Sequence, residues 1–197
     1  LNKAFQRAFS VAKQIGTETN LQRGAGAGRA VAQELAEKIL HSLHGRRVKL
    51  CLLRNARSGL CPEDCHYCSQ SAISDAAIPR YRLDSVPELL AASQRAVAAG
   101  ARRFCMVTSG RGPSAADIDR FAAAARRIKA EHPELELCVS LGLMDEDQAR
   151  ALKAAGIDFV NHNLNTSERY HPDICTTHTY ADRIRTVENV RRAGLST

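Results

Sequence analysis

The feature that most constrains the fold is an alternation of short apolar runs with amphipathic stretches. The runs are RVKLCLL (47–53), RRFCMVTS (102–109), LELCVSLG (135–142) and IDFVNHNLN (157–165). Helical patterns follow them over 87–99, 114–132, 145–156 and 179–194. Ser114 with an acid three residues later signals a helix start, and Gly156 and Gly194 signal helix ends. Apolar strands that alternate with helices indicate βαβ units and a parallel sheet.

Four such units, with "LST" (195–197) opening a fifth strand, fit an open α/β sheet or part of a (β/α)8 barrel. A complete barrel takes about 250 residues. We therefore expect an α/β fold of the (β/α)8 TIM type, truncated to about four β/α units over residues 46–197. In such a piece the first and fourth strands would be unpaired edges.

Residues 1–45 read as a separate N-terminal arm and helix. The stretch 1–29 is basic and glycine-rich, and we expect it to be mobile. Val31, Leu35, Ile39 and Leu43 have helical spacing, which predicts a helix over 30–44. Leu1 in place of Met indicates a fragment or a processed chain. The arm resembles an organelle transit segment in composition, which would make the protein mitochondrial, but an irregular arm on a cytoplasmic protein is the favoured interpretation.

The overall composition excludes several classes of protein. No apolar run approaches the roughly 18 residues of a membrane span, and no export signal is recognisable. The net charge is +7, but aromatic residues make up 5% and the arginines are dispersed, so nucleic-acid binding is not expected. Seven cysteines without an export signal favour metal or thiol chemistry over disulfides.

The strongest chemical motif is C-x3-C-x2-C, formed by Cys61, Cys65 and Cys68 directly after the first strand. In parallel α/β folds the loops after the strands carry the active site. Three thiolates on a four-iron cluster leave one iron open for a substrate or cofactor, whereas four would close the site. The alternative is a zinc site completed by His66. Glu63 and Asp64 are interpreted as turn formers.

A second pair, Cys105 and Cys138, lies in the second and third strands at comparable depth. Each alone reads as a small buried hydrophobe. Matching positions in adjacent strands instead predict that both point at one site, with Arg103 on the same face as Cys105. Cys51 and Cys175 are expected to be packing residues, and His41, His44, His132, His171 and His178 are expected to be solvated.

The run FVNHNLN places Asn161, Asn163 and Asn165 at period two. Asparagine is unfavourable in strands, so three on one strand face predict a polar, ligand-filled cavity. The alternative is that the strand frays and these residues form a loop. The glycine-rich stretch TSGRGP (108–113) follows the second strand and is either a close backbone approach to a ligand or a plain turn.

Three strings in order, CPEDCHYCSQSA, FCMVTSGRGP and NHNLNTSERY, resemble the radical S-adenosylmethionine (SAM) enzymes and, within them, the biotin synthase family. The resemblance covers about residue 35 to residue 197. It implies that Cys61, Cys65 and Cys68 ligate a [4Fe–4S] cluster whose fourth iron binds SAM. It also implies that Tyr67 lies near the adenine and that Ser109, within 108–113, holds the methionine end of SAM.

The same resemblance implies that Cys105 and Cys138 are two of the four ligands of a [2Fe–2S] cluster. The other two, a cysteine and an arginine, are expected beyond Thr197. Asn163 and Asn165 would contact SAM, and Asn161 and Asn163 the substrate dethiobiotin. The family often has aspartate at the position of Asn165, so a carboxylate role is lost here.

The function implied is radical insertion of sulfur between C6 and C9 of dethiobiotin, in a homodimer supplied with electrons by a donor such as flavodoxin or ferredoxin. The isolated chain is expected to be inactive. The alternatives are another radical SAM enzyme of the methylornithine synthase or hydrogenase maturase type, which generally lack the second cluster, and a non-catalytic metal-binding module.

Overall fold

The computed structural model describes residues 34, 37–38, 41–42, 45, 48–59 and 61–197. The chain divides into two compact units, Leu1–Val48 and Lys49–Thr197. In the first unit the described residues 34, 37–38 and 41–42 are helical, and Lys38 pairs with Glu34 at 2.7 Å. They agree with the helix predicted over 30–44, while the prediction for 1–29 falls outside the described residues.

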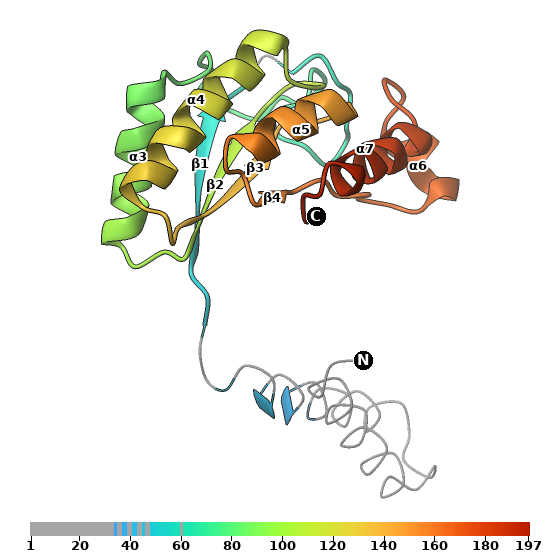
Figure 1. Cartoon of the computed structure of the whole chain (residues 1–197). Helices are drawn as coiled ribbons and strands as arrows, with labels where there is room; N and C mark the ends of the chain where they lie inside the picture. The colour runs from blue at the N-terminus through green and yellow to red at the C-terminus, as the bar shows by residue number, and fades with distance from the viewer. Residues whose placement is uncertain (1–33, 35–36, 39–40, 43–44, 46–47, 60) are drawn as a thin grey trace, which may run out of the picture. The chain divides into compact units, whose positions relative to one another are not determined.

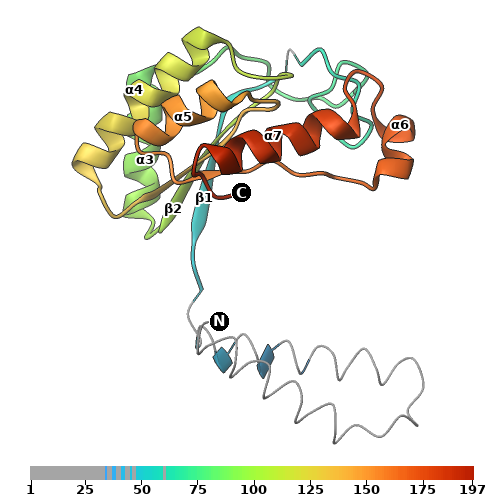
Figure 2. The same cartoon turned by 45° about the vertical axis from the view of Figure 1, so that its right-hand side comes forward.

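The second unit is a parallel four-stranded sheet in the order β1-β2-β3-β4 (Figure 1). Its strands are β1 (Cys51–Arg57), β2 (Arg103–Thr108), β3 (Glu136–Ser140) and β4 (Phe159–Val160). The connecting helices are α3 (Val86–Ala98), α4 (Ala115–Glu131), α5 (Glu146–Ala154) and α7 (Tyr180–Arg192). Figure 2 shows α3, α4 and α5 on one side of the strands. The predicted α/β architecture, part of a (β/α)8 barrel, is confirmed.

Alternation along the strands gives the sheet two different faces. Alternate strand residues on the helix-facing side enter the main hydrophobic core: Leu52, Ala56, Phe104, Met106, Leu137 and Val139. The opposite side, which would be the inside of a barrel, carries a row of register partners. That row runs Leu53, Cys105, Cys138, Phe159. The helices thus bury one face of the sheet, and the candidate site residues of the strands lie on the other face.

The first strand lies later in the chain than its apolar pattern predicts. It covers Cys51–Arg57 instead of 47–53. The polar residues in its second half are held by partners elsewhere: Arg54 bonds Asp84 at 2.7 Å, and Arg57 bonds Asp117 at 3.0 Å. These ion pairs let polar side chains occupy a strand whose hydrophobic signal ends at Leu53.

The fourth strand is shorter than predicted, and the strand prediction for Asn161, Asn163 and Asn165 was wrong. The β3–β4 pairing ends at Val139 and Val160, and Asn161 N–H makes one further bond to Val139 O at 2.8 Å. Asn165 has φ 67°, outside the strand region. Asparagine is unfavourable in strands, so the segment leaves the sheet after the apolar residues Phe159 and Val160.

The edges of the sheet differ from each other. Within the described part of the chain, β1 has β2 as its single neighbour, which confirms the predicted first edge. On the other side Ser196 forms a parallel bridge with Phe159, as expected for the start of a fifth strand, so the prediction that the fourth strand is an unpaired edge was wrong. The sequence pattern missed a turn of 3-10 helix (Glu168–Tyr170) and the short α6 (His171–Ile174) before α7. None of the helices that the structure describes is long and apolar enough to cross a membrane.

Candidate functional site

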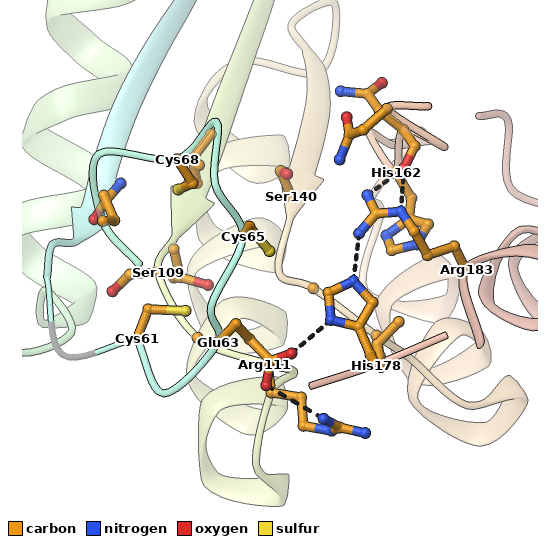
Figure 3. Close-up of a pocket in the computed structure, with 18 of the residues that line it drawn as sticks. Cys61, Glu63, Cys65, Cys68, Ser109, Arg111, Ser140, His162, His178 and Arg183 are labelled. Carbon is orange, nitrogen blue, oxygen red and sulfur yellow. Dashed lines mark hydrogen bonds and ion pairs between the residues drawn. The ribbon is translucent and has the colours of Figure 1, made fainter. Parts of the chain in front are cut away.

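A pocket lies at the carboxyl ends of the four strands, where the loops of a parallel α/β fold gather. It collects side chains from the loop after β1, from the turns after β2 and β3, from the extended segment after β4 and from the start of α7 (Figure 3). The sequence-predicted residues that line it are Cys61, Cys65, Tyr67, Cys68, Ser109, Asn161, Asn163 and Asn165. All the residues predicted for the first cluster, SAM and the substrate therefore meet in one place.

The cysteine triplet comes from a single loop that wraps one side of the pocket (Figure 3). Cys65 is buried and Cys61 and Cys68 are half-buried. The loop is tightened by a Cys68 N–H to Cys65 O bond of 3.1 Å. Burial, followed by the hydrogen bond with Cys175, raises the pKa of Cys65 to about 12. Three soft sulfur donors without a fourth cysteine among the described lining residues fit an iron–sulfur cluster with one open iron.

The predicted zinc alternative with His66 does not fit the geometry. The side chain of His66 is exposed, and its backbone N–H donates to Ile174 O at 3.0 Å. His66 therefore contributes to the position of the loop through its main chain, and it does not line the pocket.

The asparagine segment reaches the pocket although it is not a strand. Asn161, Asn163 and Asn165 all line the cavity. The amide of Asn165 donates to the hydroxyl of Tyr67, which joins two residues predicted at the SAM site. Burial raises the pKa of Tyr67 to about 12, so its hydroxyl stays protonated and available as a hydrogen-bonding group.

The turns after β2 and β3 pack backbone against backbone. Leu143 N–H donates to Arg111 O at 2.7 Å, and a Cβ on Gly142 would collide with that same carbonyl oxygen. Ser109 is buried, and its hydroxyl donates to Gly59 O in the loop that carries the cysteines. The glycines after β2 and β3 therefore permit a close approach of main chain at the rim of the pocket.

Cys105 and Cys138 are register partners in β2 and β3, as their matching positions predicted. Both are buried, at 4% and 5% exposure. The neighbouring Cys105 thiol, followed by the charge of Arg103, lowers the pKa of Cys138, and the neighbouring Cys138 thiol together with burial raises the pKa of Cys105. Arg103 bonds Glu136 at 2.8 Å and stacks over Phe159, which places its charge beside the pair.

The prediction that Glu63 is a turn former and that His178 is solvated was wrong. Both side chains are buried, and His178 Nδ1 lies 2.5 Å from Glu63 Oε2. Burial alone would raise the pKa of Glu63, but hydrogen bonds from Thr177 and His178 and the charge of Arg111 outweigh it, so this pKa is lowered. Arg183 Nη1 lies 3.0 Å from His178 Nε2, so a chain of polar contacts crosses the pocket wall (Figure 3).

Asp64 was also misjudged from the sequence. Of the two cysteines expected to be packing residues, Cys175 is buried as predicted, whereas Cys51 is exposed and that prediction was wrong. Asp64 accepts hydrogen bonds from Thr176 and Thr177, and these hold its pKa far below the usual range. Cys175 is buried, and its Sγ is 3.7 Å from Cys65 Sγ and 3.3 Å from His178 Nδ1. The one signal in the sequence was the polar run CTTH (175–178), which follows α6, and this run does not indicate which residues it contacts.

Cys65, Cys175 and His178 bring three potential metal ligands within 4.8 Å of one another. Both ring nitrogens of His178 are already hydrogen-bonded, one to Glu63 and one to Arg183. A metal ion there would have to displace one of these partners.

Comparison with known proteins identifies the family of this chain. The model of the radical SAM superfamily matches residues 57–197. A biotin synthase of Thermus thermophilus is 52% identical over 162 residues, covering 82% of this chain and 49% of the relative. A biotin synthase of Rhodopirellula baltica is 48% identical over 158 residues, covering 80% and 44%. The chain thus spans about half the length of the curated relatives it matches.

Solved structures support the fold. A methylornithine synthase matches with a TM-score of 0.72 and 21% identity, covering 93% of this chain and 52% of that one. A FeFe-hydrogenase maturase from Carboxydothermus hydrogenoformans matches with a TM-score of 0.77 and 16% identity, covering 96% and 46%. At these identities the likeness concerns the fold alone.

Proposed function

Because this chain belongs to the radical SAM superfamily, we propose that it carries the N-terminal half of a biotin synthase barrel, whose reaction is sulfur insertion into dethiobiotin. The high identity to biotin synthases supports this assignment over the structurally similar methylornithine synthase and hydrogenase maturase.

The cofactors proposed for the pocket are a [4Fe–4S] cluster and SAM. Cys61, Cys65 and Cys68 would hold the cluster, because their thiols are the soft ligands that iron–sulfur clusters require. When bound, the cluster supplies the one-electron reduction of SAM on which the superfamily's chemistry is based. The protein's contribution is to orient SAM and to exclude water.

The walls of the pocket offer complementary groups for the two ends of SAM. Tyr67 and Asn165, already in contact with each other, would face the adenosine end. Arg183 is a buried cation on the pocket wall, and it suits the carboxylate of the methionine end. Asn161 and Asn163 supply amides that can bind the ureido group of dethiobiotin, and Ser109 shapes the rim between the two sites.

The observation that carries the proposal is the position of the second cysteine pair. Cys105 and Cys138 lie side by side on the face of the sheet away from the helices, and Cys105 is four residues before Ser109 along the chain. At about 3.3 Å per residue this is roughly 13 Å below the rim of the pocket. We propose that they are two ligands of a [2Fe–2S] cluster that lies deeper in the barrel than SAM and provides the sulfur.

The remaining partners belong to the same proposal. They are an electron donor such as flavodoxin or ferredoxin and a second copy of the protein in a homodimer. The proposed location is the cytoplasm.

Anaerobic reconstitution with iron and sulfide tests the first site. The chain is expected to show the EPR signal of a reduced [4Fe–4S] cluster, and SAM is expected to change that signal. Cys65→Ser should abolish the signal, whereas Cys51→Ser, at an exposed cysteine, should not. Zinc bound in place of a cluster, or a cluster whose spectrum ignores SAM, would refute the enzyme assignment.

The second site requires a complete barrel. Joined at Thr197 to the corresponding C-terminal half of the Thermus thermophilus relative, the chain is expected to convert dethiobiotin to biotin. In this fusion Cys138→Ser should remove the [2Fe–2S] absorbance and biotin formation while SAM cleavage persists. A Cys138→Ser fusion that still forms biotin would eliminate the sulfur-insertion site proposed here.

A further inference from the structure

Arg183 is a buried guanidinium that has no carboxylate partner among the described residues. Its side chain projects from α7 into the wall of the pocket and is only 9% exposed. Nε donates to the backbone oxygen of Asn163 at 2.7 Å, and Nη2 donates to the same oxygen. A buried cation without a counter-ion is costly unless a ligand supplies the opposite charge.

The donor count shows what remains for that ligand. A guanidinium has five N–H groups. The contacts to Asn163 O use one on Nε and one on Nη2, and the contact to His178 uses one on Nη1. One N–H on each terminal nitrogen is left, and such a pair forms the fork that binds a carboxylate through two parallel bonds.

The hydrogen-bond partners of His178 determine which ring nitrogen carries the proton and how the ring is oriented. An arginine N–H can only donate, so His178 Nε2, 3.0 Å from Arg183 Nη1, must be the acceptor. Nδ1 then carries the proton and donates to Glu63 Oε2 at 2.5 Å. Because both edges of the ring are engaged inside a buried site, the imidazole cannot rotate without breaking one of these bonds.

Glu63 anchors this arrangement to the cysteine loop. It lies two residues from Cys61 and two from Cys65, and it also pairs with Arg111 at 3.3 Å. Thr177 donates to the same carboxylate oxygen that faces His178, at 2.7 Å. With one carboxylate and two guanidinium groups, Glu63, Arg111 and Arg183 carry a net charge of about +1 at neutral pH. That excess suits one additional anionic group.

We propose that Glu63 and His178 are positioning residues, which set the Arg183 guanidinium so that its free fork meets the carboxylate of SAM. This inference rests on the proposed function. They act through Arg183: Glu63 fixes the tautomer of His178, and His178 fixes the rotation of the guanidinium. The chain of contacts also links the loop that holds the first cluster to the group that holds the amino-acid end of SAM (Figure 3).

The test is anaerobic calorimetric titration of the reconstituted 197-residue chain with two ligands. SAM has the amino-acid end, whereas 5′-methylthioadenosine lacks it. His178→Phe keeps an aromatic ring but loses both hydrogen bonds. The affinity for SAM should fall by about tenfold, which corresponds to about 1.4 kcal/mol of binding free energy. The affinity for 5′-methylthioadenosine should stay within about twofold, because that ligand has no carboxylate.

Two further variants and one control complete the design. His178→Gln retains one donor and one acceptor, so it should recover most of the SAM affinity. Adding His178→Phe to Arg183→Gln should cause little further loss, because the two changes remove one interaction. His132→Phe at the end of α4 applies the same substitution outside the pocket and should leave both affinities unchanged.

The outcomes separate the two levels of the argument. If His178→Phe lowers the affinities for SAM and for 5′-methylthioadenosine equally, His178 only maintains the fold. If the affinity for SAM does not change, Arg183 needs no positioning. Either result overturns this inference alone. If the unaltered chain acquires its cluster and SAM neither binds nor perturbs it, the proposed function fails as well.

Discussion

The Sγ atoms of Cys65 and Cys175 lie 3.7 Å apart, although 110 residues separate them in the chain. Cys65 belongs to the loop after β1 and Cys175 to the turn after α6, and both are buried. Cys65 is one of the three proposed cluster ligands, whereas Cys175 does not line the pocket. A fourth thiol therefore stands directly behind the proposed cluster site.

This contact predicts that oxidation of the cluster-free protein joins Cys65 to Cys175. With oxidised glutathione, one thiolate attacks to form a mixed disulfide, and the second thiol displaces glutathione, so two glutathione thiols are released per bond formed. Because burial raises the pKa of Cys65 to about 12, little thiolate is present at neutral pH and the reaction should accelerate as the pH rises. Mass spectrometry of a non-reduced digest identifies the pair.

Cys175→Ser should prevent this disulfide, because oxidation of Cys65 would then stop at the mixed disulfide with glutathione. Cys51→Ser, at an exposed cysteine, is the matched control and should form the disulfide normally. A digest dominated by a Cys65–Cys68 disulfide would show that the loop closes on itself and would refute the prediction.

His162 predicts a loss of stability in mild acid. Burial, followed by the nearby charge of Arg183, lowers the pKa of His162 from 6.5 to about 4. The unfolded chain takes up a proton first, so the stabilising effect is complete above pH 6.5 and is lost as the pH falls towards 4. From pH 7 to pH 5 the free energy of unfolding should fall by about 2 kcal/mol more in the unaltered chain than in His162→Gln. Urea titrations at the two pH values measure this, and parallel curves for both proteins would contradict it.

Replacing Gly142 by alanine tests the close packing of the pocket rim, and Gly100 provides the matched control. Both have positive φ, 90° and 79°, so alanine is strained at each. A Cβ at Gly142 would also collide with Arg111 O, whereas nothing lies within 4 Å at Gly100. Gly100→Ala should cost about 1 kcal/mol of stability, and Gly142→Ala clearly more, about 3 kcal/mol. Equal costs in denaturant titrations would show that the turn after β2 moves aside freely.

The ion pair of Arg57 with Asp117 predicts a stability effect at the base of the site. Asp117 accepts from Arg57 at 3.0 Å and also caps α4 by accepting from Ser114 N–H at 3.1 Å. Both side chains are mostly buried, so Asp117→Asn should lower the free energy of unfolding by about 1–2 kcal/mol. Asp119→Asn, on the same helix but exposed, should change it by less than about 0.5 kcal/mol. Similar losses in both variants would argue against a specific role for the pair.

Much of the fold could be predicted because local periodicity carries it. The apolar runs and the helix signals at Ser114 and Gly156 depend on neighbours a few residues away, and the helices formed where those signals lay. The errors fell where partners are distant. The second half of β1 depends on Asp84 and Asp117, and the fourth strand ended early because asparagine has no preference for the ladder.

The candidate site divides in the same way. The spacing of Cys61, Cys65 and Cys68 along one loop is a local property that the sequence shows, and the structure places all three at the pocket. It also pairs Cys105 with Cys138 in register. The role of these cysteines as ligands stays a prediction. Glu63, His178 and Cys175 gave no such signal. Each acquires its significance from a residue more than 100 positions away.

The sequence by itself determined the alternation of strands and helices, the three-thiol loop and the faces on which the strand cysteines lie, because these follow from spacing along one backbone. Only the tertiary structure decided which charges are buried together. It placed Glu63 against His178, His178 against Arg183 and Cys175 behind Cys65. Burial is a property of the packed chain, and it converts ordinary polar residues into a fixed tautomer, an oriented guanidinium and a thiol that resists ionisation.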